Sequence, residues 1–387
     1  MHEMDFNQQP YLVVWECTRA CMLACRHCRA ASQPRRHPQE LTTEEGRRFI
    51  EQVARAKPGI FIITGGDPAQ RPDFKEMIAC GAQQGLRVAF SPSATPKLLG
   101  NDFKELKSLG VARMSLSVDG ACAETHNAFR GVAKSWDWTM EAIARAQAAE
   151  LPLQINSTFT RRNIAEFDLF PPLLERIKPA TWSVFLLVPT GRGKVEDLLT
   201  GQEIEELFER LYVLSQKVPY PIKTTEGQHY RRVILQHSVP QASSPAVGAP
   251  ASSPALLVQA SSPAVVPHVF PSAGQAGTPA VPPGAKPSPF SGSMGVNDGK
   301  GFVFVSHVGD ICPSGFLPYI AGNVRRDELI EVYRNSPIFR ELRDSSLLKG
   351  KCGRCEFKDL CGGSRARAYA MTGDHLAEEP FCVYQPK

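Results

Sequence analysis

The eight residues from Cys21 to Cys28 contain three cysteines, Cys21, Cys25 and Cys28, in a C-x3-C-x2-C pattern. Three closely spaced thiolates suit a [4Fe-4S] cluster, yet they ligate only three of its four irons. The fourth iron is then open to a small chelating molecule. The pattern therefore predicts a cluster that binds a further molecule directly.

A zinc site is the alternative for this run, with His27 or Cys17 as the fourth ligand. His27 lies between two of the cysteines, whereas structural zinc ligands usually come as two separated pairs. Cys17 lies one x3 step before Cys21, but only the triplet has the x3 and then x2 spacing. We therefore interpret Cys17 as a buried thiol at the end of the first strand.

A second group of cysteines lies near the carboxyl terminus, where Cys352-x2-Cys355-x5-Cys361 is followed by Cys382. Four thiolates fully ligate a second [4Fe-4S] cluster, which can relay electrons, anchor the tail or help to place a substrate. A zinc ribbon built from the same four residues is the alternative. For Cys312, a metal ligand and an ordinary buried thiol both remain open.

Polar and glycine residues gather where short apolar runs end. Thr64-Gly65-Gly66-Asp67-Pro68 follows one such run, and glycine lets backbone groups approach a ligand closely. Ser117 and Asp119 are alternate residues at the end of another run, so they face the same side. Further candidates at such ends are Ser91, Asn156, Thr158 and Val188. The carboxyl ends of strands are where β/α barrels gather their sites.

From residue 11 to about residue 220, short β-branched runs alternate with longer amphipathic ones, which predicts parallel strands joined by helices. The predicted strands are Tyr11–Trp15, Ile60–Ile63, Arg87–Phe90, Arg113–Val118, Leu153–Thr158 and Trp182–Val188. The predicted helices include Thr43–Arg55, with a capping box of Thr42 and Glu45, Asp73–Gln84, Pro96–Leu109, Ser135–Ala148 and Ile164–Ile177. We therefore expect an α/β fold of six β/α units, two fewer than a closed barrel has.

Residues 238–293 differ in composition from the rest of the chain. Between Arg232 and Lys286 there is no Asp, Glu, Lys or Arg, and proline, alanine and serine dominate. Such a segment has too few large side chains to offset the cost of ordering its backbone. We predict a disordered or partly polyproline-II linker, with recognition of a proline-rich peptide as the alternative.

Residues 294–387 regain a globular pattern. Gly301–Ser306 and the residues around Ile311 predict a hairpin, and Asp327–Arg334 and Pro337–Arg343 predict helices. The cysteine-containing tail that follows is rich in loops.

Composition limits the classes of function. The chain has 387 residues, 42% of them hydrophobic, which is enough for one large domain and a smaller one. Its net charge of +5 gives no case for nucleic acid and suits a small anionic substrate. The polar start Met1–Asp5 has no signal region and no run approaches membrane-spanning length, so we expect a cytoplasmic protein without a membrane span. Clustered cysteines in such a chain favour metal ligation over disulfides.

The cysteine triplet and the Thr64–Pro68 segment together resemble the radical S-adenosylmethionine (SAM) superfamily, whose members hold SAM on the open iron. The resemblance covers nearly the whole chain outside the linker. It implies a partial (β/α)6 barrel over residues 1–237. It also implies that reductive cleavage of SAM yields a 5′-deoxyadenosyl radical, which abstracts a substrate hydrogen. The implied SAM contacts are Gly65, Gly66, Asp67 and Pro68, with Asp67 where the family has glutamate, and Ser91, Ser117, Asp119, Asn156, Thr158 and Val188.

The tail resembles the SPASM or twitch-like extension of such enzymes, a loop-rich iron-sulfur module, here residues 294–387. Full versions carry two auxiliary clusters and have a further cysteine where this chain has Arg365. No upstream cysteine pair lies near Met294. We therefore predict one auxiliary [4Fe-4S] cluster, held by the four cysteines of the tail.

Two stretches resemble the haem-biosynthesis branch of the superfamily, Val188–Gly193 and Cys361–Ala370. That branch includes an iron-coproporphyrin decarboxylase and a haem d1 enzyme, which implies oxidative decarboxylation or a related change at a propionate side chain of a tetrapyrrole. Arginine pairs with carboxylates in two bonds, so Arg192, Arg365 and Arg367 are predicted substrate contacts. Surface or inter-domain salt bridges are the alternative role for these three.

Two other functions remain open. Other SPASM enzymes are maturases that modify a peptide or protein, although many have an N-terminal peptide-clasping domain, and only about ten residues precede the first strand here. A non-catalytic iron-sulfur electron carrier would neither bind nor cleave SAM. The radical SAM reading also requires an electron donor such as flavodoxin or ferredoxin.

Overall fold

The computed structural model describes residues 4–238 and 295–387. The predicted linker lies outside these ranges, apart from residue 238. The parallel strands are β1 (Leu12–Glu16), β2 (Ile60–Thr64), β3 (Val88–Phe90), β4 (Val111–Ser117), β5 (Leu153–Phe159), β6 (Thr181–Leu186) and β7 (Ile222–Thr225). All six predicted strands are present, with ends displaced by at most two residues. Strand β7 is an addition that the sequence analysis missed.

A hairpin from the carboxyl-terminal part extends the same sheet. It consists of β8 (Phe302–Val305) and β9 (Asp310–Cys312), as predicted, and β9 also pairs with β10 (Gly322–Asn323). Strand β8 lies parallel to β1, with Phe302 opposite Leu12. The strand order is β10-β9-β8-β1-β2-β3-β4-β5-β6-β7, so β10 and β7 form the two edges of an open, barrel-like sheet.

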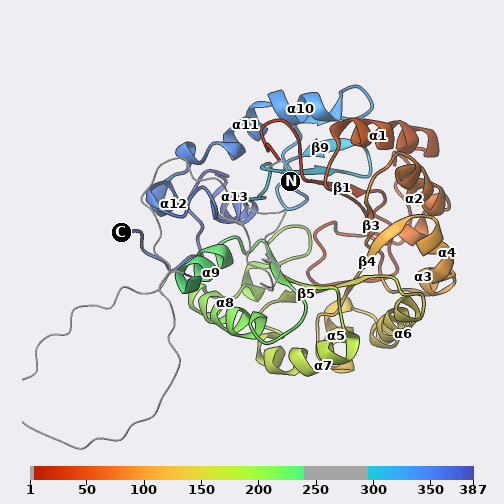
Figure 1. The fold of residues 1–387 in the computed structure, drawn as a ribbon, viewed down its shortest axis with the longest axis horizontal. Coiled ribbons are helices and arrows are strands. Elements are labelled where there is room, and N and C mark those ends of the chain that lie inside the picture. The colour runs from red at the N-terminus through yellow and green to blue at the C-terminus, as the bar shows by residue number, and fades with distance from the viewer. Residues whose placement is uncertain (1–3, 239–294) are drawn as a thin grey trace, which may run out of the picture.

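Helices surround the outside of this curved sheet (Figure 1). The longer ones are α1 (Thr43–Ala56), α2 (Phe74–Gln83), α5 (Ala123–Arg130), α6 (Ser135–Ala148), α7 (Phe170–Ile177), α8 (Gly201–Ser215), α9 (Tyr230–Ser238) and α13 (Arg365–Thr372). The shorter ones are α3 (Pro96–Leu99), α4 (Phe103–Ser108), α10 (Leu329–Asn335), α11 (Pro337–Arg343) and α12 (Gly350–Arg354), with 3-10 turns at Pro68–Gln70, Ile164–Leu169, Val195–Asp197 and Ser345–Leu347. No helix in the described ranges is long and apolar enough to cross a membrane.

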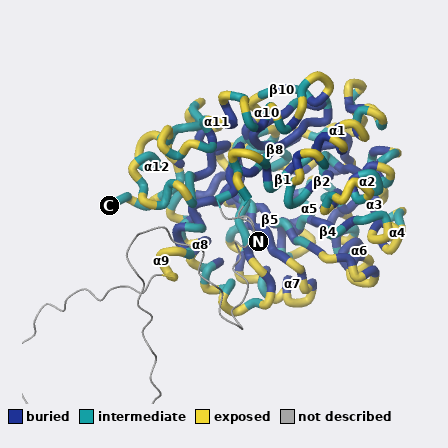
Figure 2. Tube along the Cα trace, turned by 45° about the horizontal axis from the view of Figure 1, so that its top comes forward, coloured by how far each residue is buried: buried dark blue, intermediate teal, exposed yellow. Residues whose placement is uncertain are grey.

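The main hydrophobic core lies between the sheet and the helices. Its members alternate along the strands and are fully buried, for example Trp15, Phe61, Met114 and Trp182. Figure 2 shows this burial along the strands and exposure on the outer sides of the helices. Because side chains alternate across a strand, the residues between these core positions face the inside of the barrel. The inner face of the sheet therefore differs in composition from the apolar face that packs on the helices. On β4 to β7 the inner face is polar.

Local sequence explains where two predicted helices differ from the structure. Helix α1 begins with the predicted capping box, in which Thr42 and Glu45 exchange side-chain to backbone hydrogen bonds. The predicted helix Pro96–Leu109 is instead split into α3 and α4, because Asp102 caps the start of α4. The predicted helix Ile164–Ile177 begins as a 3-10 turn, and α7 starts only at Phe170, next to two prolines that fit its first turn.

The cysteine-containing tail bridges the two sides of the opening in the barrel. In Figure 1, α12 and α13 lie between α11 and α9. Ser364 donates to Glu226, which follows β7, and the backbone N–H of Ala366 donates to Asp298, which precedes β8, at 2.9 Å. Both acids are buried, and desolvation raises the pKa of each; the neighbouring charge of Asp298 raises the pKa of Glu226 further. The tail is thus packed into the barrel.

Candidate functional site

The cysteine triplet lies on the loop after β1, and the protein surrounds its sulfurs with donors. The backbone N–H of Leu23 donates to Cys21 Sγ at 3.3 Å, and that of Ser32 donates to Cys28 Sγ at 3.4 Å. Burial raises the pKa of Cys21 to about 11, and burial also raises the pKa of Cys25 above its usual value. Without a metal these thiols would stay protonated, and a bound metal is what makes such a thiol a thiolate. The donors fit a cluster.

The middle cysteine of the triplet, Cys25, contacts an ion pair that the sequence analysis missed. Arg130, at the end of α5, donates to Cys25 Sγ at 3.5 Å and pairs with Asp119 at 2.6 Å. Asp119 is fully buried, and its other oxygen accepts the backbone N–H of Thr158 at 2.8 Å. The charge of Arg130 keeps the pKa of Asp119 below its usual value although burial opposes this. Asp119 thus positions Arg130, and this contact differs from the direct SAM contact that the resemblance implied.

Glycines let two other loops close over the cysteine loop. A side-chain carbon on Gly65 would lie 2.6 Å from Thr18 O, and one on Gly66 would lie 2.6 Å from Ala20 O. In Gly191, whose φ is +64°, it would overlap the carbonyl oxygens of the loop at Cys28. These positions require glycine because backbone packs directly on backbone. The predicted SAM loop after β2 is therefore in contact with the cysteine loop.

Asp67 has a structural task within that SAM loop. Its carboxylate caps the 3-10 turn that starts at Pro68, accepting from Ala69 N at 3.2 Å, and it also accepts from Thr95 Oγ1 at 2.7 Å. Ser93, which sequence reasoning missed, donates to Gly66 O at 2.8 Å and lies 3.5 Å from Cys21 Sγ. Asp67 and Ser93 thus fix the SAM loop beside the site formed by Cys21, Cys25 and Cys28, here called the cluster seat.

The remaining predicted SAM contacts fall into two groups. Ser117 and Asn156 are register partners on neighbouring strands, half-buried on the inner face, and Ser91 is half-buried at the end of β3. Thr158 and Val188 are buried. Ser91, Ser117, Asn156 and Thr158 therefore lie on the inner face, and the first three are partly exposed there.

The hydrogen-bond donors of Arg192 are occupied by backbone oxygens of the cysteine loop. Its guanidinium donates to Cys25 O at 2.8 Å and to Ser32 O at 3.0 Å, and its backbone N–H donates to Cys28 O at 3.0 Å. These bonds favour the structural alternative over the predicted substrate contact. Arg192 closes the loop against the segment after β6.

A second charged group that the sequence did not reveal lies behind the loop. Glu16, at the end of β1, is fully buried and pairs with Arg29 at 2.5 Å, Arg19 at 3.0 Å and His307 at 3.2 Å. Burial alone would raise its pKa, but these partners hold the pKa near 2. Arg29 also stacks on Phe304 of β8, with 4.6 Å between the guanidinium carbon of Arg29 and the centre of the Phe304 ring. The hairpin is thereby tied to the cysteine loop.

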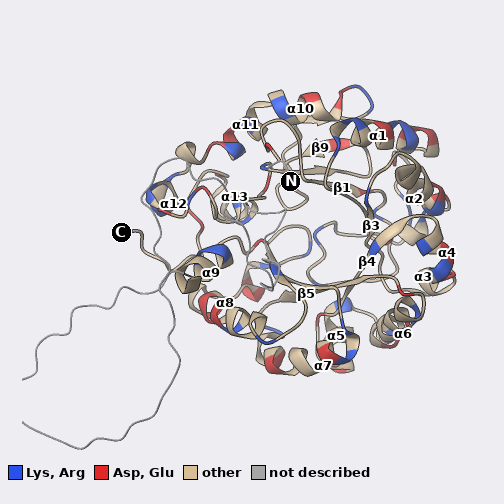
Figure 3. Cartoon of the chain, viewed as in Figure 1, with Lys and Arg blue, Asp and Glu red and all other residues tan. Residues whose placement is uncertain are grey.

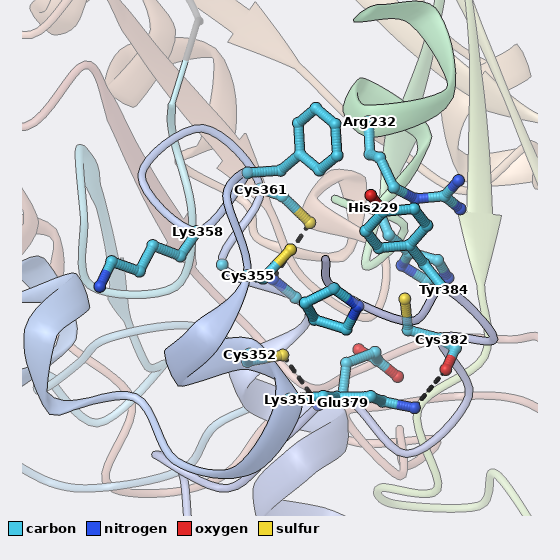
Figure 4. A pocket seen from close by; sticks show the side chains of 14 residues that line it. His229, Arg232, Lys351, Cys352, Cys355, Lys358, Cys361, Glu379, Cys382 and Tyr384 are labelled. Atoms are coloured by element: carbon cyan, nitrogen blue, oxygen red, sulfur yellow. Dashed lines mark hydrogen bonds between the residues drawn. The ribbon is translucent and has the colours of Figure 1, made fainter. Parts of the chain in front are cut away.

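The four cysteines of the tail, predicted to hold a second cluster, line one pocket. Figure 4 shows Cys352, Cys355, Cys361 and Cys382 around this space, with His229 and Arg232 of the α9 region on another side. The backbone N–H of Glu379 donates to Cys352 Sγ at 3.3 Å, and that of Gly363 donates to Cys361 Sγ at 3.4 Å. Cys312 is buried on β9 and is not among the lining residues. The donor set again fits a thiolate-held cluster.

In the described ranges, no three His, Cys, Asp or Glu side chains converge closely enough to hold a single metal ion. A cluster of four irons spans more space than one ion. The fit to a cluster therefore rests on the two sets of cysteines and the N–H groups around their sulfurs.

Arg365 and Arg367 lie in the protein interior next to this pocket. Arg365 donates to Ala377 O at 2.6 Å, and its guanidinium lies 3.9 Å from Cys352 Sγ. Arg367 pairs with the buried Glu379 at 2.8 Å. Both residues are 1% exposed and these partners belong to the tail itself, so these contacts favour a structural role within the tail over the predicted substrate contact.

Known proteins resemble this chain over most of its length. The family model of the radical SAM superfamily matches residues 15–168. The AdoMet-dependent heme synthase of Methanosarcina barkeri is 37% identical over 377 residues, 97% of each chain, and that of Nitratidesulfovibrio vulgaris is 36% identical over 378 residues, 97% of this chain and 93% of the relative. Streptococcus suis SuiB bound to the precursor peptide SuiA is similar in fold, with a TM-score of 0.67 and 15% identity over 97% of this chain and 76% of that one.

Proposed function

The chain belongs to the radical SAM superfamily, and we propose that it modifies the propionate side chains of a haem-like tetrapyrrole. The substrate class is supported by the full-length identity of 37% to an AdoMet-dependent heme synthase. The seat of Cys21, Cys25 and Cys28, with donors aimed at all three sulfurs, is the structural observation that supports the chemistry. When bound there, a [4Fe-4S] cluster and SAM supply a 5′-deoxyadenosyl radical that removes a substrate hydrogen.

The protein's own groups prepare this seat. The N–H donors of Leu23 and Ser32 and the guanidinium of Arg130 stabilise sulfur in the charged, ligating form. Arg192 and the glycines at positions 65, 66 and 191 hold the loop closed around it. Ser91, Ser117 and Asn156 offer polar groups to SAM on the inner side of the sheet.

We propose that the tail holds one auxiliary [4Fe-4S] cluster. The four thiols share a pocket, and burial raises the pKa of Cys361 to about 12 and that of Cys382 to about 11, so a bound metal is needed to make them thiolates. Metal and sulfide analysis of the anaerobically purified protein separates this from a zinc ribbon. Zinc in place of iron and sulfide at the quartet would overturn it.

We infer that a one-electron donor such as flavodoxin or ferredoxin docks over the cysteine loop. The loop reaches the surface at Met22, which is 50% exposed, and at Arg26, which is also exposed. Acidic partners are attracted to positive patches at rates that fall with salt. Reduction of the cluster by such a donor should therefore slow as ionic strength rises.

The proposed function is tested by incubating the anaerobically reconstituted, dithionite-reduced enzyme with SAM and iron-coproporphyrin III. We expect 5′-deoxyadenosine, and we expect the tetrapyrrole to lose carbon dioxide and two hydrogens per modified propionate. One hydrogen atom goes to the 5′-deoxyadenosyl radical, the other leaves as a proton, and the remaining electron passes to a one-electron acceptor included in the assay. Formation of 5′-deoxyadenosine only with added peptides would favour a maturase. Absence of any SAM cleavage would contradict the proposed enzymatic activity and would favour the non-catalytic electron carrier.

A further inference from the structure

The inner face of strands β4 to β7 is polar and carries two positive charges but no carboxylate. Its residues are Arg113, Ser115 and Ser117 on β4, Gln154, Asn156 and Thr158 on β5, Thr181, Ser183 and Phe185 on β6, and Lys223 and Thr225 on β7. Asn156 lies opposite Ser183, and Ser183 lies opposite Lys223. Figure 3 shows that Lys, Arg, Asp and Glu gather mainly on the outer helices, so charge on this face is unusual.

Neither cation has an acidic partner in the described part of the chain. Arg113 donates only to the hydroxyl of Thr181, at 3.2 Å. No hydrogen bond or ion pair of the Lys223 side chain is present within residues 4–238 and 295–387, and the charge that acts on it is that of Arg113. By contrast, Glu16 and Asp119, the buried acids near the other end of the inner face, are both neutralised by arginine.

Such an arrangement is costly for the empty protein. Both side chains are half-buried, and a charge partly removed from water is normally paired, because the lost hydration outweighs what a single hydroxyl returns. Burial and the nearby Arg113 lower the pKa of Lys223 to about 8, and burial and Arg87 lower the pKa of Arg113. A bound anion would offset the repulsion between Lys223 and Arg113 and would give both side chains an ion-pair partner.

We propose that Lys223 and Arg113 bind a carboxylate of the substrate inside the barrel. This inference rests on the proposed function and names the part of the site that recognises the peripheral carboxylates. Lys223 lies in one register row across the inner face with Ser183, Asn156 and Ser117, two of which are proposed SAM contacts. A substrate carboxylate that reaches this row of inner-face residues can therefore pair with the two cations.

The three arginines predicted from sequence do not compete for this role. Arg192, Arg365 and Arg367 donate to backbone oxygens or to a buried glutamate. A carboxylate binding there would have to displace these bonds. Arg113 and Lys223 have no such bonds to lose, apart from one to a hydroxyl group.

The test measures the dissociation constant of iron-coproporphyrin III by absorbance titration with the reconstituted holoenzyme and its variants. We expect Lys223→Met and Arg113→Gln each to weaken binding roughly tenfold or more, as loss of a charge-assisted bond does. Lys223→Arg keeps the charge and should bind within about threefold of wild type. Lys217→Met, at the exposed end of α8, is the matched control and should bind as wild type does.

A porphyrin with esterified propionates separates recognition of charge from a change in shape. Wild type and Lys223→Met should bind this ester equally, and each variant should retain the wild-type iron content. The inference is overturned if Lys223→Met binds the free acid as tightly as wild type does. It is also overturned if the substitution weakens binding of the ester as much as binding of the free acid. If wild type itself binds no coproporphyrin, the proposed function fails as well, so the two failures can be told apart.

Discussion

The guanidinium of Arg130 lies 3.5 Å from the sulfur of Cys25 and donates a hydrogen bond to it. The same guanidinium is anchored by Asp119, at 2.6 Å, deep in the protein. A positive charge at this position stabilises the ligating thiolate and balances negative charge on a bound cluster. Asp119 and Arg130 therefore act as a pair that prepares the cluster seat.

Replacing Arg130 should weaken the hold on the cluster. We expect Arg130→Gln to retain iron about 10- to 100-fold less tightly, the usual cost of losing a group that orients a metal ligand. The measurement is iron loss to a chelator under anaerobic conditions. Arg176→Gln, on the exposed side of α7, is the control. Equal retention by the two variants would mean that the contact to Cys25 has no effect on the cluster.

Gly191 and Gly85 form a matched pair that isolates loop packing from backbone strain. Both have a left-handed backbone, with φ of +64° and +76°, but only Gly191 faces other atoms. Gly85→Ala should cost about 1 kcal/mol of unfolding free energy, from strain alone. Gly191→Ala should cost about 1–3 kcal/mol more because the methyl group overlaps the cysteine loop.

Urea denaturation of the two reconstituted variants checks this comparison. Gly191→Ala should also contain less iron than Gly85→Ala, since the loop that it displaces carries Cys28. The packing argument would be wrong if the two substitutions were equally costly.

Removing the Glu16 carboxylate should destabilise the protein at neutral pH. Glu16 pairs with Arg29 at 2.5 Å and with His307 at 3.2 Å in a fully buried position. Breaking a buried pair by removing one partner typically costs about 3–5 kcal/mol, because the other charge stays buried. We expect Glu16→Gln to show a loss of this size in denaturant, and Glu141→Gln, on the exposed side of α6, to show little change.

The affinity for the carboxylate substrate should fall in alkaline solution. The pKa of Lys223 is lowered to about 8 in the free protein by burial and by the neighbouring Arg113. Arg87 and Tyr11 act in turn on Arg113. Below pH 8, Lys223 carries the charge that binds the anion; above it, each pH unit should weaken binding by up to tenfold, because a proton must be taken up.

Titrations of iron-coproporphyrin III from pH 7 to pH 9.5 measure this dependence. Lys223→Arg, whose guanidinium stays charged throughout, should remove most of it. A wild-type affinity that stays constant up to pH 9.5 would exclude titration of Lys223 from the binding site.

Much of the fold could be predicted from local sequence, and the reasons for the misses are physical. The six predicted strands are apolar runs that can be detected in the sequence. Strand β7 was missed because it is short, follows Pro221 and contains Lys223. The capping box at Thr42 is a local pattern and is present. The parallel pairing of β8 with β1 joins residues far apart in the chain, and no local pattern encodes it.

The candidate site shows the same division. Cysteine spacing is local, so both sets of thiols could be identified from sequence, and the quartet does share a pocket. The contact of Arg130 with Cys25 spans 105 residues, and the arginines chosen from the haem-branch resemblance turn out to have protein partners. Lys223 and Arg113 become noticeable only when the register shows that no acid shares their face.

The central claim is that this enzyme takes a hydrogen atom from a propionate arm of a tetrapyrrole. The most direct measurement uses iron-coproporphyrin III deuterated on its propionate side chains, with the reduced enzyme and SAM. The account predicts that deuterium appears in the 5′-deoxyadenosine by mass spectrometry, together with loss of carbon dioxide from the porphyrin. Deuterium-free 5′-deoxyadenosine beside an unchanged porphyrin would contradict it.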